Sequence, residues 1–145
     1  MPSRLKILFL CTGNACRSQM SEGWARHLKG SLIDAYSAGV APHGVDPRAV
    51  QVMAEAGVDI SGHTSKHLDT LLDVPFDYVV TVCDNAAESC PIFPGRVAKV
   101  HRSFQDPPQL ARGAATEEEA LAHYRRVRDE IRAFIETLPG ALSQS

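Results

Sequence analysis

The chain has 145 residues, of which 44% are hydrophobic and 22% are charged. Its 15 Lys and Arg and 17 Asp and Glu leave a formal net charge of -2, which argues against a protein that holds nucleic acid or an anionic membrane through bulk charge. The composition is that of a globular protein and excludes the disordered and fibrous classes. At this length we expect one domain over residues 1–145, and a monomer.

The first predicted element is a strand over 5–10, a short apolar run typical of a strand buried on both faces. The run has some likeness to an export signal, but the apolar core of a signal needs about 7 to 15 residues. We therefore expect a cytoplasmic protein. In that compartment structural disulfides are rare, so catalytic, redox or metal-binding roles are favoured for the cysteines at positions 11, 16, 83 and 90.

Helices and strands are predicted in alternation along the rest of the chain. Asp46 before Pro47 is typical of a helix start, and Thr116 with Glu119 three residues later forms a capping box. The predicted elements are a helix over 18–28, a strand over 32–37, a helix over 46–57, a short helix over 65–72, strands over 76–83 and 97–101, and a long helix over 116–138.

This alternation predicts an α/β fold of three layers, in which helices cover both faces of a four-stranded parallel sheet. Ligands bind such sheets at the carboxyl ends of the strands, where Cys11 and Cys83 end two of the predicted strands. The loop after the fourth strand brings Asp106 to the same edge. We expect the Pro-, Gly- and Ala-rich segment 106–115 to be a mobile active-site loop.

Segment 11–18, CTGNACRS, places a cysteine and an arginine six positions apart on a tight turn between a strand and a helix. The backbone N–H groups of such a turn, the helix N-terminus and the Arg17 guanidinium together suit a tetrahedral oxyanion. The same positive field predicts a nucleophilic thiolate at Cys11. The alternative, that Cys11 is only a small apolar residue, fits the surrounding turn less well, whereas Cys16 is interpreted as a packing residue.

A zinc site is another interpretation of four cysteines and six histidines. Structural zinc sites favour cysteines separated by two to four residues, which Cys11 and Cys16 satisfy but Cys83 and Cys90 do not. The histidines are scattered along the chain, so we expect no metal.

Segment 11–18 resembles the anion loop of the low-molecular-weight protein tyrosine phosphatase fold. The chain departs from the phosphatase pattern at Gln19, where a proline is usual, and in its acid loop over 106–109, which has no tyrosine; both departures resemble the thioredoxin-coupled arsenate reductases. Segment 80–91 adds Cys83 and Cys90, a thiol pair that a reductase needs and a phosphatase does not. The likeness extends over nearly the whole chain, through segments 36–39, 43–47, 63–65 and 125–130.

This resemblance implies the reduction of arsenate to arsenite, for detoxification beside a separate efflux system. Cys11 would attack arsenic while Asp106 gives a proton to the departing oxygen, Cys83 would attack Cys11 and release arsenite, and Cys90 would attack Cys83. Thioredoxin would reduce the last disulfide, although a glutaredoxin-like reductant also fits, and no cofactor is expected to be bound. The implied catalytic residues are Cys11, Cys83, Cys90, Arg17 and Asp106, and the implied oxyanion-binding residues are Thr12, Gly13, Asn14, Ala15, Cys16, Arg17 and Ser18.

The redox steps carry two finer expectations. Ser18 can donate a hydrogen bond to the Cys11 thiolate. Residues 84–89 can form a short helix whose unfolding lets Cys90 approach Cys83, since a disulfide needs Cα atoms within about 7 Å.

Some members of the family bind a potassium ion through residues that match Asn14, Glu22 and Ser37 and through an acidic residue, at whose position this chain has Lys66. We expect the Lys66 ammonium to replace the ion and to pair with Glu22, which predicts activity that is independent of potassium.

Two other functions stay open. A phosphatase acting on phosphotyrosine or small phosphate esters would share Cys11, Arg17 and Asp106, and weak hydrolysis of this kind is also expected beside reduction. A redox-sensing module that binds an oxyanion would be oxidised once, without turnover.

Overall fold

A sheet of four parallel strands lies at the centre of the computed structural model, which describes residues 4–83 and 97–144. The strands follow the order β2-β1-β3-β4 across the sheet. They are β1 (Leu5–Cys11), β2 (Ile33–Gly39), β3 (Tyr78–Thr81) and β4 (Ala98–His101). The predicted four-stranded parallel sheet is therefore confirmed.

Strand β1 lies inside the sheet, and residues 7–11 of it are all buried. Its unbroken apolar run suits this place, because side chains on both faces of a central strand are covered. Leu10 is paired with Thr81 of β3, and Cys11 with Gly39 of β2. This register sets the first residue after β1 next to the first residues after β3, at the carboxyl edge of the sheet.

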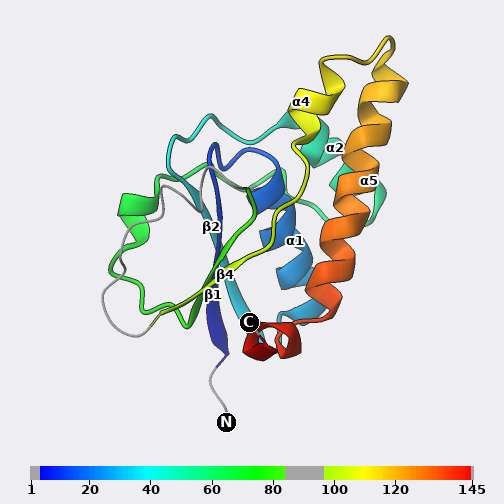
Figure 1. Ribbon diagram of the computed structural model, residues 1–145. Helices are drawn as coiled ribbons and strands as arrows, with labels where there is room; N and C mark the ends of the chain where they lie inside the picture. The colour runs from blue at the N-terminus through cyan, green and yellow to red at the C-terminus, as the bar shows by residue number, and fades with distance from the viewer. Residues whose placement is uncertain (1–3, 84–96, 145) are drawn as a thin grey trace.

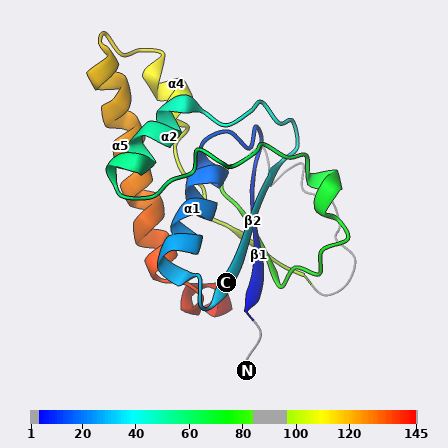
Figure 2. The same cartoon turned by 180° about the vertical axis from the view of Figure 1, so that it is seen from behind.

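Helices α1 (Arg17–Lys29), α2 (Pro47–Glu55), α4 (Pro107–Ala111) and α5 (Glu117–Glu136) lie on one side of the sheet. The indole N–H of Trp24 on α1 donates to the carbonyl of Arg128 on α5 at 3.2 Å. The short 3-10 helix η1 (Leu68–Leu71) lies on the opposite side, as both ribbon views show (Figures 1 and 2). A second 3-10 helix, η2 (Gly140–Gln144), ends the described chain. No helix within residues 4–83 and 97–144 is long and apolar enough to cross a bilayer.

The predicted helix starts are confirmed by their caps. The Asp46 carboxylate accepts a hydrogen bond from the backbone N–H of Arg48 at 2.9 Å, and the Thr116 hydroxyl accepts one from that of Glu119 at 3.1 Å. Each cap satisfies a backbone donor that has no partner inside its helix.

Two predictions of local structure differ from the structure. The short helix predicted over 65–72 is present only in part, as the 3-10 helix η1. The segment 106–115, predicted as a loop, contains α4, which begins at Pro107 directly after Asp106. A proline at the first helical position has its φ already set for a helix and lacks an N–H that would be unpaired there, so Asp106-Pro107 starts a helix here as Asp46-Pro47 does.

Candidate active site

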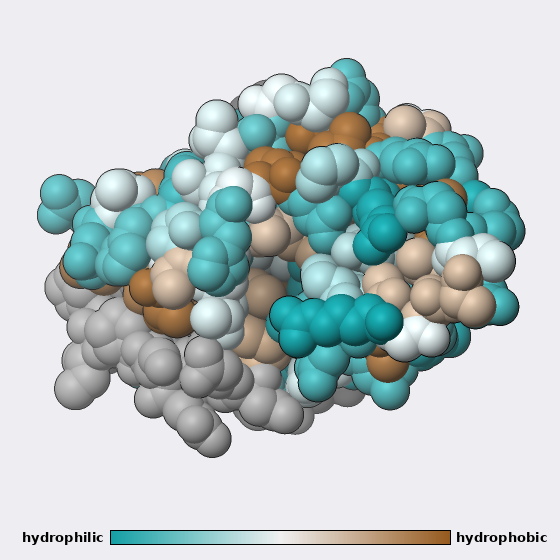
Figure 3. All heavy atoms as spheres, turned by 90° about the horizontal axis from the view of Figure 1, so that it is seen from above, coloured by the Kyte–Doolittle hydropathy of each residue, from teal (hydrophilic) through white to brown (hydrophobic). Residues whose placement is uncertain are grey.

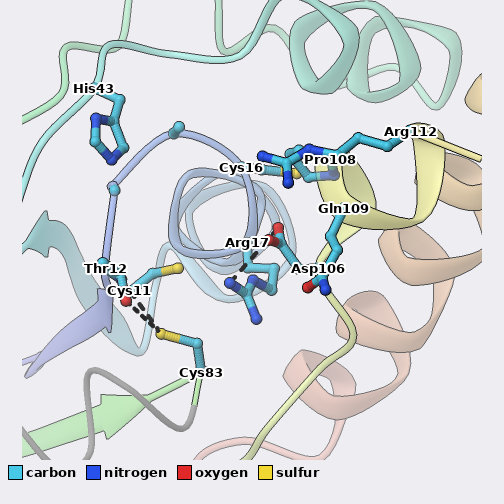
Figure 4. A pocket seen from close by; sticks show the side chains of 12 residues that line it. Cys11, Thr12, Cys16, Arg17, His43, Cys83, Asp106, Pro108, Gln109 and Arg112 are labelled. Atoms are coloured by element: carbon cyan, nitrogen blue, oxygen red, sulfur yellow. Dashed lines mark hydrogen bonds and ion pairs between the residues drawn. The ribbon is translucent and has the colours of Figure 1, made fainter.

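A pocket of about 480 Å³ opens at the carboxyl edge of the sheet. Figure 3 looks onto this face and shows a hollow near its centre among mainly hydrophilic side chains. Figure 4 shows the side chains that surround the pocket. They come from the loop after β1, from the ends of β2 and β3 and the segments that follow, and from α4: Cys11, Thr12, Gly13, Ala15, Cys16, Arg17, His43, Cys83, Asp106, Pro108, Gln109 and Arg112.

The structure thus brings four of the predicted catalytic residues to one pocket: Cys11, Cys83, Arg17 and Asp106. The fifth, Cys90, lies outside the described residues, as does the helix expected over 84–89. Four further lining residues, His43, Pro108, Gln109 and Arg112, were not predicted as site residues. Arg112 directly follows α4. Its place at the pocket could have been predicted from the sequence only if residues 107–111 had been recognised as a helix.

Asn14 closes the anion loop, residues 11–18, onto its neighbours. The residue is fully buried with φ at +46°, a left-handed conformation that Asn tolerates better than most residues. Its side-chain amide donates to the Ser18 hydroxyl at 2.9 Å and accepts from the backbone N–H of Lys66 at 2.8 Å. Ser18 is therefore held by Asn14, and among the described residues no hydrogen bond joins Ser18 to Cys11.

The backbone carbonyls of residues 12–15 are all bonded away from the pocket. Those of residues 12, 13 and 15 accept from the backbone N–H groups of residues 41, 43 and 46 at 2.8–2.9 Å, and that of Asn14 accepts from the side chain of Gln19 at 3.1 Å. In a trans peptide the N–H points opposite to the C=O. The N–H groups of residues 13–16 are thereby turned toward the pocket, as an oxyanion site requires.

The Arg17 guanidinium is held by two neighbouring residues through its Nη atoms, while its Nε has no partner among the described residues. Its Nη1 donates to the carbonyl of Phe104 at 2.9 Å, and its Nη2 lies 3.6 Å from a carboxylate oxygen of Asp106. Its Nε is buried without a hydrogen-bond partner among the described residues. A buried donor without a partner is costly, so a ligand oxygen that reached this atom would be stabilised by it.

Cys83 lies against the start of the anion loop. Its Sγ is 3.3 Å from both the backbone nitrogen and the hydroxyl oxygen of Thr12. Cys11 and Cys83 are both buried and not disulfide-bonded, and Figure 4 shows their side chains beside Thr12 at the pocket. A second thiol therefore lies next to the predicted nucleophile.

The thiolate expected at Cys11 is not favoured in this arrangement. The neighbouring Cys83 thiol and then burial raise the pKa of Cys11, and the positive charge of Arg17 offsets only part of this effect. The local sequence around Cys11 gives the effect of the loop and of Arg17 but not the effect of Cys83, which is distant in the chain. Burial also raises the pKa of Cys16, which keeps that thiol protonated and agrees with its interpretation as a packing residue.

We expect Cys83→Ala to shift the pH midpoint of Cys11 alkylation to lower pH, because the group that contributes most to raising the pKa of Cys11 is removed. The measurement is the rate of Cys11 modification by iodoacetamide against pH, read by mass spectrometry of the Cys11 peptide. Cys16→Ala is the matched control and should shift the midpoint less, since Cys16 contributes least. An unchanged midpoint in Cys83→Ala would contradict the prediction.

The expected pairing of Lys66 with Glu22 was wrong. The buried Glu22 carboxylate accepts from the Ser37 hydroxyl at 2.7 Å and lies 3.2 Å from Arg26 Nη2, one helical turn along α1. Lys66 Nζ donates to the carbonyl of Thr64 at 2.9 Å. Arg26 thus supplies the charge that was expected from Lys66, and independence of potassium stays a prediction.

Comparison with known proteins gives the family of the chain. The family described as low molecular weight phosphotyrosine protein phosphatase matches residues 6–145. A curated arsenate reductase of Halalkalibacterium halodurans is 50% identical over 131 residues, 90% of this chain and 92% of that protein. An arsenate reductase structure from Archaeoglobus fulgidus gives a TM-score of 0.70 at 29% identity, over 92% of this chain and 98% of that one.

A phosphatase matches about as well in structure. A low molecular weight protein tyrosine phosphatase from T. tengcongensis gives a TM-score of 0.69 at 27% identity, over 92% of this chain and 97% of that one. Proteins named for two different activities therefore share the fold in which this chain holds its anion loop. The chain belongs to the low molecular weight phosphotyrosine protein phosphatase family, together with the arsenate reductases that it resembles in sequence.

Proposed function

We propose that the protein is an arsenate reductase that works through Cys11, Cys83 and Cys90 and is regenerated by thioredoxin. The observation that carries the proposal is Cys83, a second buried thiol that lines the oxyanion pocket with Cys11 and lies 3.3 Å from Thr12. Hydrolysis of a phosphate ester needs one thiol, whereas reduction of arsenate needs two electrons from a thiol pair. Relatives named arsenate reductase support the choice of substrate.

In the first step arsenate binds to the N–H groups of residues 13–16 and to Arg17, the Cys11 thiol gives its proton to an oxygen of the bound dianion, and the resulting thiolate attacks arsenic. The bound oxyanion competes with Asp106 for the guanidinium, which lies 3.6 Å from that carboxylate. Asp106 can then give its proton to the departing oxygen, which leaves as water.

In the second step Cys83 attacks the sulfur of Cys11. The backbone N–H of Thr12, 3.3 Å from Cys83 Sγ, and its hydroxyl at the same distance can both donate to a thiolate at Cys83 and stabilise it. The electron pair of the sulfur–arsenic bond stays with arsenic, which is reduced from As(V) to As(III). Arsenite leaves, and a Cys11–Cys83 disulfide remains.

In the third step Cys90 attacks Cys83, so that Cys11 returns to the thiolate and the disulfide moves to Cys83–Cys90. Thioredoxin reduces this bond by the same exchange chemistry, without a bound cofactor. A cytoplasmic role in arsenic detoxification belongs to the same proposal.

The test is arsenate-dependent oxidation of NADPH in the presence of thioredoxin and thioredoxin reductase, measured beside hydrolysis of an aryl phosphate. Cys90→Ser should abolish steady-state arsenate turnover, because the Cys11–Cys83 disulfide can no longer move outward. Aryl phosphate hydrolysis should survive in this variant, since that reaction uses Cys11, Arg17 and Asp106. Undiminished turnover with thioredoxin in Cys90→Ser would contradict the relay.

The second candidate is a phosphatase, favoured by the placement of Cys11, Arg17 and Asp106 at one pocket and by the phosphatase of matching fold. Brisk ester hydrolysis without arsenate turnover, with either thioredoxin or glutaredoxin, would establish it. One oxidation per molecule without turnover would instead indicate a redox-sensing module.

A further inference from the structure

The charges around the pocket do not suit a dianion if Arg17 acts alone. Arg17 Nη2 lies 3.6 Å from Asp106 Oδ1, so the guanidinium already has a carboxylate beside it. With Cys11 protonated, Arg17 and Asp106 together carry no net charge, so this pair alone gives little net attraction for arsenate or phosphate, both largely dianionic near neutral pH.

Arg112 supplies a second permanent positive charge. It follows α4, lines the same pocket and is exposed to solvent. Within residues 4–83 and 97–144 its guanidinium makes no ion pair and no hydrogen bond, whereas seven other arginines each lie within 4.0 Å of a carboxylate: Arg17, Arg26, Arg48, Arg125, Arg126, Arg128 and Arg132. Its charge is therefore not neutralised by a described neighbour.

The side chain of Arg112 reaches toward the anion loop. Figure 4 shows it extending from the end of α4 past Pro108 to the side of the loop that carries Cys16, while Arg17 lies deeper beside Asp106. The two guanidinium groups thus stand at different depths of one pocket. His43 lines the opposite rim, where its ring packs so closely on Gly13 that a Cβ there would come within 2.6 Å of it.

We propose that Arg112 is a specificity-determining residue that recruits small dianionic oxyanions to this pocket. With Arg112 the three charged groups Arg17, Asp106 and Arg112 carry a net charge of +1, which attracts the dianion. The exposed guanidinium meets the anion first and remains near its outward oxygens when the anion has reached Arg17. The inference rests on the proposed function in so far as arsenate is the substrate, but it requires only that the pocket binds an oxyanion.

The test uses inorganic phosphate to protect Cys11 from iodoacetamide, a neutral reagent whose own approach is not steered by charge. The concentration for half-protection is measured at low and high salt by mass spectrometry of the Cys11 peptide. The variants are Arg112→Gln, Arg112→Lys and, as a matched exposed arginine remote from the pocket, Arg126→Gln. Arsenate KM and kcat are measured on the same proteins.

In Arg112→Gln we expect the half-protection concentration at low salt to rise about three- to tenfold, with a weaker dependence on salt. KM for arsenate should rise in parallel while kcat changes little, and Arg112→Lys should keep most of the binding because it keeps the charge. Half-protection and salt dependence in Arg112→Gln equal to those of Arg126→Gln would overturn the inference. Protection by phosphate without arsenate turnover would refute only the proposed function, so the two failures are distinguishable.

Discussion

Replacing Arg17 with lysine is expected to lower kcat/KM for arsenate by about 10²- to 10³-fold while the protein remains folded. The guanidinium uses one nitrogen on the carbonyl of Phe104, a second near Asp106 and leaves Nε without a partner for the substrate. A lysine ammonium is a single point of charge and cannot make these three contacts in fixed directions. The lysine would still attract the anion by its charge, but it would not hold the anion in one orientation.

The measurement is the steady-state rate with arsenate, together with aryl phosphate hydrolysis, which should fall by a similar factor because both reactions use the same cradle. Arg126→Lys, on the exposed face of α5, is the control and should leave both rates unchanged. If Arg17→Lys kept activity within about tenfold of the wild type, fixed donor geometry would not be the source of oxyanion stabilisation.

Gly39→Ala is expected to destabilise the fold by about 1–3 kcal/mol and to weaken oxyanion binding at the same time. Gly39 ends β2 directly behind the anion loop. A Cβ at this position would lie 2.6 Å from the carbonyl oxygen of Thr12 and 2.8 Å from the backbone nitrogen of Asn14. Both are backbone atoms of the loop, so the loop itself must move, and the N–H groups of residues 13–16 would move with it.

Urea unfolding and phosphate protection of Cys11 together measure this effect. Gly62→Ala is the matched control, because a Cβ at that position meets no atom within 4 Å. The control should bind phosphate like the wild type and lose little stability. A Gly39→Ala protein with unchanged phosphate binding would show that the loop tolerates the displacement, contrary to the expectation.

The sequence was sufficient for features that depend on local pattern. The apolar run of β1 predicts a buried central strand, and the spacing of Cys11 and Arg17 predicts an anion loop because both lie on one short turn. Asp46-Pro47 likewise predicts a capped helix from two adjacent residues. The predicted strand ends also placed Cys83 and Asp106 at the same edge of the sheet, and both line the pocket.

Features that depend on contacts between distant segments were not predictable in this way. The pKa of Cys11 depends on Cys83, 72 positions further along, and no local pattern gives the orientation of that thiol. Glu22 pairs with Arg26 and not with Lys66. Residues four apart lie on the same face of α1, so Arg26 is close to Glu22 whatever the position of the loop that carries Lys66. Arg112 gains its place at the pocket only through the direction of α4.

The pairing of β1 with β3 has a consequence for how an enzyme of this family can acquire a new chemistry. The second thiol is presented by the end of a strand, while the anion cradle is built by a different segment, and the two meet only because Leu10 is in register with Thr81. A frame suited to hydrolysis can therefore become one suited to electron transfer through changes after β3 that leave the cradle intact. In protein engineering, the position that follows a parallel strand is thus a natural place to graft a redox group onto a finished oxyanion site.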